Sequence, residues 1–300
     1  MTNLEELWTT TNGIETHGGQ FGAKYCFPVL SELFIKSCPK LNVKPYFPPS
    51  LVTLSFQESN EQLLCPGSSS DLYLPLVEES SSSSSMHSAV SHLRVLNLTE
   101  MTTSSSSWEF LQFHTELVTL SIDSCGDLTQ LPETIRSLTS LENLCINRCS
   151  NLAMMPEWLG ELRLLRSLSV YTTPMIDSLP QSTEHLKSIT MLQISGWRNM
   201  KQLPDVIQHL FSLELLNLAN CSALTVLPEW IGQLSALRRI WIQHCSALEC
   251  LPQSIQRLTA LRELKISWCR GLYRRYKRGL GPDWHLISHI PDVRIDGRLE

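Results

Sequence analysis

Apolar residues recur along this chain at a fixed interval of 24 residues, from its middle almost to its end. Each interval opens on a leucine or isoleucine, and further apolar residues follow three and five positions later. The opening positions are Leu117, Leu141, Leu165, Ile189, Leu213, Leu237 and Leu261. The full unit reads L-x-x-L-x-I-x-x-C-x-x-L-x-x-L-P-E-x-I-x-x-L-x-x, without an insertion between registers. Such self-similarity indicates a repeat architecture.

Each unit predicts one short strand and one return segment. The alternation of apolar and polar residues in the L-x-I segment is typical of a strand with one buried face. The Pro-Glu pair then opens a turn or short helix, with proline at the first helical position, where its missing N–H has no partner to lose. Ile135 and Leu138 direct the return segment into the interior. One unit cannot bury its apolar face alone, so neighbouring units must stack.

The stacked units predict an α/β solenoid shaped like a horseshoe, with a parallel β-sheet on the concave face and short helices or turns on the convex face. Regular repeats span 92–272, and 273–300 form a C-terminal cap. Residues 1–56 carry degraded repeats, beginning with a truncated unit at Met1 to Trp8. Residues 57–91 are rich in serine and predict a flexible insertion, because they have too little apolar surface to offset the entropy of ordering.

Charge and composition argue against several classes of function. The formal net charge of −5 predicts no overall attraction to nucleic acid or to an anionic membrane, and the basic run from Arg270 to Arg278 is interpreted as a solvated end cap. No segment approaches the ~20 uninterrupted apolar residues of a membrane-spanning helix. Residues 1–11 include Glu5 and Glu6 and lack the basic, apolar prefix of a signal peptide. The ten cysteines are therefore expected in a reducing compartment, which predicts a cytoplasmic location.

The cysteines that share one position of the unit are the first candidates for chemistry: Cys125, Cys149, Cys221, Cys245 and Cys269. A zinc site needs convergent ligands, often spaced C-x-x-C, and this chain has no such pair. We expect instead a ladder of buried thiols that bond weakly to turn carbonyls. His285 and His289 lack the adjacent Glu of a metalloprotease motif and are interpreted as cap packing. Without a G-x-S-x-G elbow either, we expect no enzyme, cofactor or metal.

The unit resembles the cytoplasmic leucine-rich repeats of plant disease-resistance proteins, the immune receptors that join a coiled coil, a nucleotide-binding switch domain and a repeat domain. The resemblance covers essentially the whole chain. It is carried by LELLNLANCSALTVLPEWIGQL at 213–234, FPVLSELFIKSCPKL at 27–41 and HIPDVRIDG at 289–297. It implies a domain of innate immunity that recognises a pathogen effector or a host protein and holds the nucleotide switch inactive.

The chain departs from that family because it contains no G-x-x-x-x-G-K-[ST] phosphate loop and no coiled coil. A nucleotide-binding switch domain would therefore be supplied by another chain. We expect a protein-binding repeat domain of the disease-resistance type. The alternative is a free-standing leucine-rich-repeat adaptor or scaffold in an unrelated complex.

The outward side chains of the predicted strands line the concave face, which is the candidate partner-binding surface. Early units present small polar residues such as Ser121 and Asn143, whereas later units present aromatic and cationic residues, the types that dominate binding hot spots. The predicted contact residues are Tyr171, Met191, Leu215, Arg239, Trp241, His244, Lys265 and Trp268. The sequence leaves open the alternative that Trp241 and Trp268 pack beneath the C-terminal cap.

Overall fold

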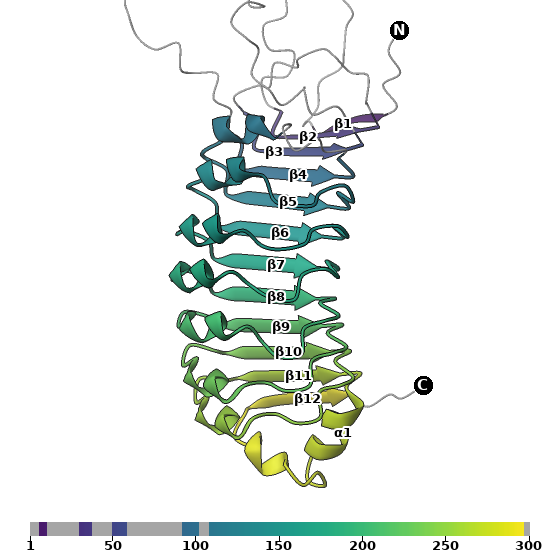
Figure 1. Cartoon of the computed structure of the whole chain (residues 1–300), viewed down its shortest axis with the longest axis vertical. Helices are drawn as coiled ribbons and strands as arrows, with labels where there is room; N and C mark the ends of the chain where they lie inside the picture. Colours follow the sequence, from purple (N-terminus) through teal and green to yellow (C-terminus); the bar gives the residue numbers. More distant parts are fainter. Residues whose placement is uncertain (1–5, 11–29, 38–49, 59–91, 102–107, 297–300) are drawn as a thin grey trace, which may run out of the picture.

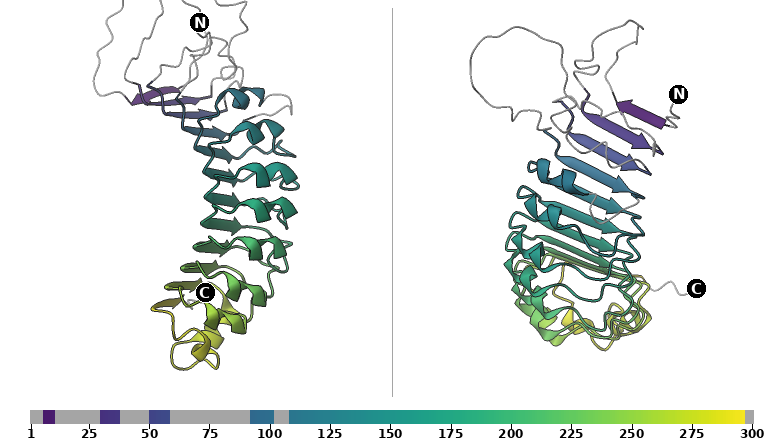
Figure 2. Two further views of the ribbon diagram at one scale, coloured as in Figure 1. Left: turned by 90° about the vertical axis from the view of Figure 1, so that its left-hand side faces the viewer. Right: turned by 45° about the horizontal axis from the view of Figure 1, so that its top comes forward.

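The computed structural model describes residues 6–10, 30–37, 50–58, 92–101 and 108–296, which build one curved sheet backed by short helices (Figure 1). The strands follow one another in chain order. β2 to β12 run parallel, and β1 runs antiparallel to β2. In side view the strands line the concave side of a bent stack and the helices its convex side (Figure 2). The predicted horseshoe is confirmed.

Every strand is five residues long, and each regular coil contains one strand and one 3-10 helix. The strands are β1 (Glu6–Thr10), β2 (Glu32–Lys36), β3 (Thr53–Gln57), β4 (Val95–Thr99), β5 (Thr119–Asp123), β6 (Asn143–Asn147), β7 (Ser167–Tyr171), β8 (Met191–Ser195), β9 (Leu215–Ala219), β10 (Arg239–Gln243), β11 (Glu263–Ser267) and β12 (Asp292–Asp296). The 3-10 helices are η2 (Glu109–Phe113), η3 (Glu133–Ser137), η4 (Glu157–Glu161), η5 (Gln181–His185), η6 (Asp205–His209), η7 (Glu229–Gln233), η8 (Gln253–Arg257) and η9 (Trp284–Leu286). One α-helix, α1 (Arg270–Tyr276), follows β11.

Residues one unit apart stand side by side in the sheet. Leu144 of β6 lies opposite Leu120 of β5 and Leu168 of β7, and the same register continues to β11. The leucine and isoleucine positions of these strands point inward and belong to one continuous buried core. In β5, β6 and β10 they alternate with part-exposed residues, the period of two that a half-buried strand requires. Stacking thus buries the apolar face that no single coil could cover.

The residue after each regular strand adopts a left-handed backbone conformation. From β4 to β11 these residues have positive φ: Glu100, Ser124, Arg148, Thr172, Gly196, Asn220, His244 and Trp268. The left-handed region costs a non-glycine residue roughly 1–2 kcal/mol. The backbone N–H of each, from Glu100 to His244, donates to the carbonyl that ends the next strand, as Ser124 N does to Asn147 O at 2.9 Å. This repeated hydrogen bond between coils offsets part of the strain.

The return segments place proline one residue earlier than the sequence predicts. Pro132 precedes η3 with φ −61° and ψ 137°, an extended conformation, and the helix begins at Glu133. Its carbonyl accepts the N–H of Ile135 at 3.2 Å, which closes a 3-10 turn on the proline. Proline's fixed φ suits this extended residue. The prediction that proline takes the first helical position is therefore wrong.

Two pairs of neighbouring return helices are joined by a glutamate of the earlier coil. The N–H of Ser182 in η5 donates to Glu157 of η4 at 3.1 Å, and the N–H of Ser254 in η8 donates to Glu229 of η7 at 2.9 Å. A glycine follows each glutamate in the sequence E-W-x-G. A Cβ on Gly160 would lie 2.2 Å from the carbonyl oxygen of Ser182, so the close approach requires glycine.

The N-terminal end of the sheet differs from the prediction. β1 places Glu6 opposite Lys36 in antiparallel register, whereas a repeat strand would run parallel. The segment predicted to be a truncated unit is therefore an edge strand, because leucine spacing does not encode strand direction. The predicted serine-rich insertion, 57–91, lies outside the described residues except for Gln57, which ends β3, and Glu58.

The C-terminal cap is continuous with the sheet. α1 begins at Arg270, before the predicted boundary at residue 273, and buries Leu272 and Tyr276. The Tyr276 hydroxyl accepts the backbone N–H of Leu251 at 2.9 Å, which ties the helix to the preceding coil. β12 then adds one more parallel strand beside β11. The cap therefore adds a strand to the sheet as well as covering the end of the core.

Candidate functional site

The first, third and fifth residues of each strand face the concave side, and their chemistry changes along the stack. The central row runs from Ser121, Cys145 and Ser169 through Gln193 and Asn217 to Trp241 and Lys265, each opposite the next in the parallel register. Small polar side chains therefore give way to an aromatic ring and a cation toward the C-terminal end. Six of the predicted contact residues lie on β7 to β11, and His244 and Trp268 directly follow β10 and β11.

Trp241 is the centre of a cluster of cations on β10 and β11. The Lys265 ammonium lies 4.8 Å from the centroid of the Trp241 ring, and the Arg239 guanidinium lies 5.9 Å from it. Lys265 also forms an ion pair with Glu263, whereas Arg239 pairs with no carboxylate among the described residues. Each cation–π contact is worth about 0.5–1 kcal/mol at an exposed site. The ring therefore holds both cations in place on the concave surface.

His244 and Trp268 stack on one another at the edge where the strands end. Both occupy the left-handed position, in adjacent coils, so their rings lie parallel with centroids 5.4 Å apart and planes 4° from each other. Trp268 is 43% exposed. This excludes the alternative that Trp268 packs beneath the cap. Trp241 is half-buried by its neighbours in the sheet, since the cations over its ring come from β10 and β11.

The prediction that Leu215 contacts a partner does not fit its burial in the structure. It lies on the concave side between Met191 and Arg239 of the neighbouring strands, yet only 1% of it is exposed. It also stands outside the main core cluster. The long side chains on either side flank this shorter one. Leu215 therefore presents almost nothing to a partner.

Tyr171 joins the predicted surface through Gln193 and Asn217, two residues outside the predicted contact set. Its hydroxyl donates to Gln193 Oε1, which also accepts from Asn217 Nδ2 at 3.3 Å, and Gln193 Nε2 donates to Met191 Sδ at 2.9 Å. Burial raises the pKa of Tyr171, which keeps its hydroxyl protonated as a donor. Gln193 and Asn217 lie in the central concave row, so strand alternation identifies their positions, but not their mutual bonds.

The repeat cysteines form the predicted ladder of buried thiols. Each donates to the carbonyl two residues before it, as Cys221 does to Ala219 at 3.3 Å and Cys245 to Gln243 at 3.4 Å. The neighbouring Cys221 thiol and burial raise the pKa of Cys245 to about 12. Across the described residues no group of three or more His, Cys, Asp or Glu side chains is arranged to hold a metal ion. The ladder is therefore part of the packing.

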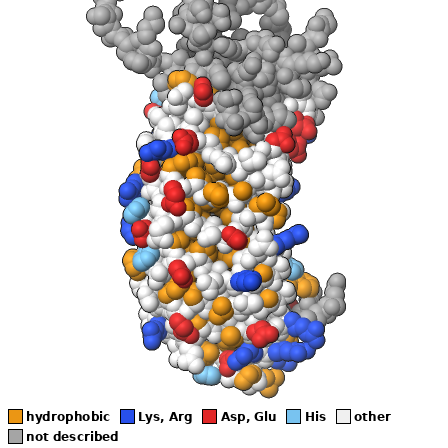
Figure 3. All heavy atoms as spheres, viewed as in Figure 1, with side chains coloured by type: hydrophobic (Ala, Val, Ile, Leu, Met, Phe, Trp, Pro, Cys, Tyr) orange, Lys and Arg blue, Asp and Glu red, His pale blue; other side chains and the backbone are white. Residues whose placement is uncertain are grey.

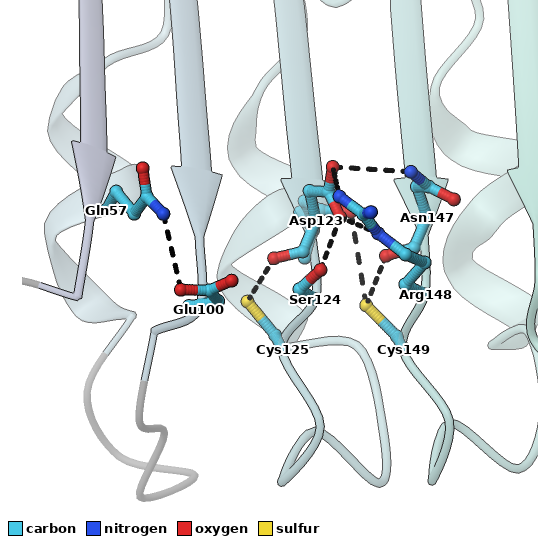
Figure 4. Close-up of polar contacts among 9 residues, drawn as sticks. Gln57, Glu100, Asp123, Ser124, Cys125, Asn147, Arg148 and Cys149 are labelled. Atoms are coloured by element: carbon cyan, nitrogen blue, oxygen red, sulfur yellow. Dashed lines mark hydrogen bonds and ion pairs between the residues drawn. The ribbon is translucent and has the colours of Figure 1, made fainter.

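An ion pair at the strand-end edge ties the earlier coils together (Figure 4). Arg148 donates two hydrogen bonds of 2.9 Å to the carboxylate of Asp123, which also accepts from Ser124 and Asn147. Burial disfavours ionisation of Asp123, but these donors hold the pKa of its carboxyl below the usual value. All its partners lie in the same or the next coil. The cluster thus fastens neighbouring coils and carries no group poised for proton transfer.

A family model described as a leucine-rich repeat region matches residues 157–297, the part of the chain that contains most of this surface. The fold is a leucine-rich-repeat solenoid. Among the described residues, none of the helices combines the length and the apolar character needed to cross a bilayer. Among curated protein sequences, the search found no significant match to the chain.

Solved structures similar to this leucine-rich-repeat solenoid come from several kinds of protein. The leucine-rich repeat domain of the type III effector XopL is 26% identical with a TM-score of 0.48, over 63% of this chain and 72% of that one. TLR13 in complex with ssRNA13 is 18% identical with a TM-score of 0.54, over 88% and 37%. The plant peptide hormone receptor RGFR1 in complex with RGF2 is 16% identical with a TM-score of 0.41, over 79% and 43%. The chain thus spans less than half of either receptor, and the TLR13 likeness shows the fold alone.

Proposed function

We propose that this solenoid is a protein-binding domain of the plant disease-resistance type, and that its partner docks on the C-terminal part of the concave face. We define the C-terminal concave surface as Met191, Arg239, Trp241, His244, Lys265 and Trp268. The observation that carries the proposal is the cluster in which Arg239 and Lys265 flank the ring of Trp241. A preorganised aromatic and cationic cluster loses little side-chain freedom on binding, which favours affinity.

The remaining concave face supports this location by contrast. Ser121, Asn143 and Asn147 are small and polar, and the two asparagines bond to their neighbours within the sheet. Tryptophan and arginine are enriched among the residues that dominate interface energies, whereas serine is depleted. A partner therefore gains most of its contact energy between β8 and β11.

The disease-resistance assignment rests on the repeat subclass. The cysteine of the unit L-x-x-L-x-I-x-x-C is a buried hydrogen-bond donor in this fold, so the feature that defines the resemblance has a structural role. The described cysteines are unpaired, as in a reducing, cytoplasmic compartment. The partner in this proposal is a pathogen effector or a host protein, with a nucleotide-binding switch domain supplied by another chain. The domain itself has a binding role and no catalytic one.

The experiment compares partner capture by the full chain and two double variants in the tissue that produces it. Arg239→Ala with Trp241→Ala removes the centre of the surface, while Ser121→Ala with Asn143→Ala changes the same face at its other end. We expect proximity labelling to lose a defined set of proteins in the first variant only, with thermal unfolding of both kept near that of the wild type. Equal labelling by all three chains would rule out the C-terminal concave surface as the docking site.

The identity of the proteins that the Arg239→Ala, Trp241→Ala variant no longer labels tests the disease-resistance assignment. A nucleotide-binding switch protein or a defence component among them supports the receptor role. Components of an unrelated assembly would instead favour the adaptor role and contradict the disease-resistance assignment.

A further inference from the structure

The cap presents a second surface, separate from the C-terminal concave surface. Arg270, Arg274, Lys277 and Arg278 all lie exposed on α1 or directly after it. Within the described residues none of these four forms an ion pair, whereas the adjacent Arg275 is paired with Asp283. Lysine and arginine side chains gather over α1 at the lower end of the molecule (Figure 3). The cap therefore carries unneutralised positive charge on one side.

This charge is opposite to that of the molecule as a whole. Residues 270–283 contain five Lys and Arg residues and one Asp, a formal charge of +4, while the full chain carries −5. A field with this asymmetry steers an acidic ligand toward the cap and away from the rest of the solenoid. The steering acts before any contact forms.

The four cations are not needed to hold α1 in place. Leu272 and Tyr276 form the buried face of the helix, and the Tyr276 hydroxyl bonds the backbone of Leu251. Arg270 and Arg274 are four residues apart on the exposed face, where like charges destabilise a helix by about 0.2–0.5 kcal/mol. Their arrangement therefore slightly opposes folding, and a partner with carboxylates would relieve the repulsion.

A turn that follows Lys277 and Arg278 exposes an apolar side chain. Leu280 is 75% exposed. The carbonyl of Lys277 accepts the backbone N–H of Leu280 at 3.0 Å and that of Gly281 at 2.7 Å, which fixes the turn. A Cβ on Gly281 would lie 2.1 Å from the Arg275 carbonyl oxygen, so glycine is required there. A purely solvated cap has no need of a fixed turn that exposes a leucine.

We propose that this terminal basic surface, defined as Arg270, Arg274, Lys277, Arg278 and Leu280, binds an acidic protein segment that carries an apolar side chain between its carboxylates. The carboxylates pair with the cations, and the apolar side chain packs on Leu280. The inference goes beyond the proposed function, because this surface lies on the cap and excludes Arg239 and Trp241. A nucleic acid or an anionic membrane would use the charge but gain little from a single exposed leucine.

The test measures binding of short fluorescent peptides to the full chain by anisotropy. The probe is a peptide of repeated Glu-Glu-Leu triplets, and its comparators are Glu-Glu-Ser and Lys-Lys-Leu repeats. We expect Glu-Glu-Leu to bind about tenfold more tightly than Glu-Glu-Ser and Lys-Lys-Leu not to bind, since burial of one leucine is worth about that factor. Leu280→Ser should abolish the preference for the leucine-bearing peptide.

Charge reversal locates the site. Arg270→Glu with Arg274→Glu should weaken Glu-Glu-Leu binding by about tenfold or more, because two charge pairs are lost. Arg163→Glu with Arg198→Glu makes the same change in net charge at two exposed arginines of the solenoid and should leave binding nearly unchanged. Arg239→Ala with Trp241→Ala should also leave it unchanged, which separates this proposal from the concave surface.

Three results would overturn the proposal. Equal weakening by both charge-reversed pairs would show attraction to net charge only. Equal affinity for Glu-Glu-Leu and Glu-Glu-Ser would remove the role of Leu280. Tighter binding of single-stranded RNA, or of vesicles that contain phosphatidylserine, than of Glu-Glu-Leu would assign the surface to another class of ligand.

Discussion

Gly160 and Ser182 touch across the boundary between two coils, with the Gly160 N–H donating to Ser182 Oγ at 3.3 Å. The backbone of Ser182 occupies the space that a side chain at residue 160 would need. The same close approach to a serine backbone recurs where Gly232 meets Ser254. Each contact couples one return helix to the next, on the convex side of the solenoid.

Gly160→Ala should lower the free energy of unfolding by about 1–3 kcal/mol, because the added methyl group overpacks the contact with Ser182. Gly126→Ala is the matched control, since a Cβ at Gly126 would meet nothing within 4 Å. Chemical denaturation of both variants measures the difference. A loss at Gly126 as large as that at Gly160 would contradict the steric explanation.

Glu229→Gln should make the chain less stable at neutral pH, because the Glu229 carboxylate accepts the N–H groups of Gln253 and Ser254. Burial opposes its ionisation, but the hydrogen bonds from Ser254 and Gln253 hold the pKa of Glu229 below its usual value. A lowered folded-state pKa adds stability above the unfolded pKa, and this contribution is lost as pH falls through the folded value. We expect about 0.5–1 kcal/mol, as for the loss of a helix cap.

The pH profile distinguishes this role from a general effect of charge. The difference between wild type and Glu229→Gln should be constant above about pH 4.5 and shrink in more acidic solution. Glu133→Gln is the control, because Glu133 is exposed at the same position of an earlier coil. A difference that persists unchanged at low pH would show that the carboxylate charge is not responsible.

Gly196→Ala should destabilise the chain by about 1–3 kcal/mol, since alanine is disfavoured at positive φ and its Cβ would overpack the neighbouring coil. Gly196 has φ of 77°, and a Cβ there would lie 3.0 Å from the Cα of Thr172. A second substitution should have the opposite effect on stability. Thr172→Asn should stabilise the chain by roughly a few tenths of a kcal/mol, because asparagine tolerates the left-handed region better than a β-branched residue. Thermal unfolding measures both changes. A destabilising Thr172→Asn would disprove the role assigned to backbone strain.

Among the seven cysteines that the structure describes, the thiols should separate into two classes on alkylation of the native protein with iodoacetamide. Cys125, Cys149, Cys221, Cys245 and Cys269 are buried, whereas Cys145 and Cys250 are partly exposed. The raised pKa of Cys245 also keeps its thiol protonated and unreactive. Mass spectrometry should find Cys145 and Cys250 modified first, and the ladder modified only after denaturant is added. Rapid labelling of Cys221 or Cys245 in the folded chain would contradict the buried ladder.

The sequence predicts the features that depend on spacing alone. Because the interval is constant, Leu120, Leu144 and Leu168 had to stand beside one another, and the alternation around them had to divide core from concave face. The burial of the Cys245 thiol follows from the same regularity, although the carbonyl that it donates to belongs to Gln243, at the end of β10, and not to the predicted turn. Trp241 and Lys265 occupy the same position of adjacent units, so the constant interval also makes them neighbours, and the structure places them in contact.

Features that depend on the shape of a neighbour or on strand direction could not be predicted in this way. The burial of Leu215 depends on the longer side chains of Met191 and Arg239 beside it. The contact between Gly160 and Ser182 requires the path of two return helices, which hydrophobic spacing does not specify. The direction of β1 is likewise absent from its pattern of leucines. The sequence therefore identified which positions form the candidate surface. Their hydrogen bonds, ring contacts and exposure are known only from the structure.

The alternation along each strand also bears on how such a chain can change over generations. Ile240 and Ile242 belong to the buried core, while Arg239 and Trp241, which alternate with them along β10, face outward. A substitution at an outward position alters the chemistry offered to a partner but leaves the inward neighbours and their contacts intact. Binding specificity can therefore change by one outward substitution at a time, with little change in the stability of the fold. No loop has to lengthen and no strand has to move.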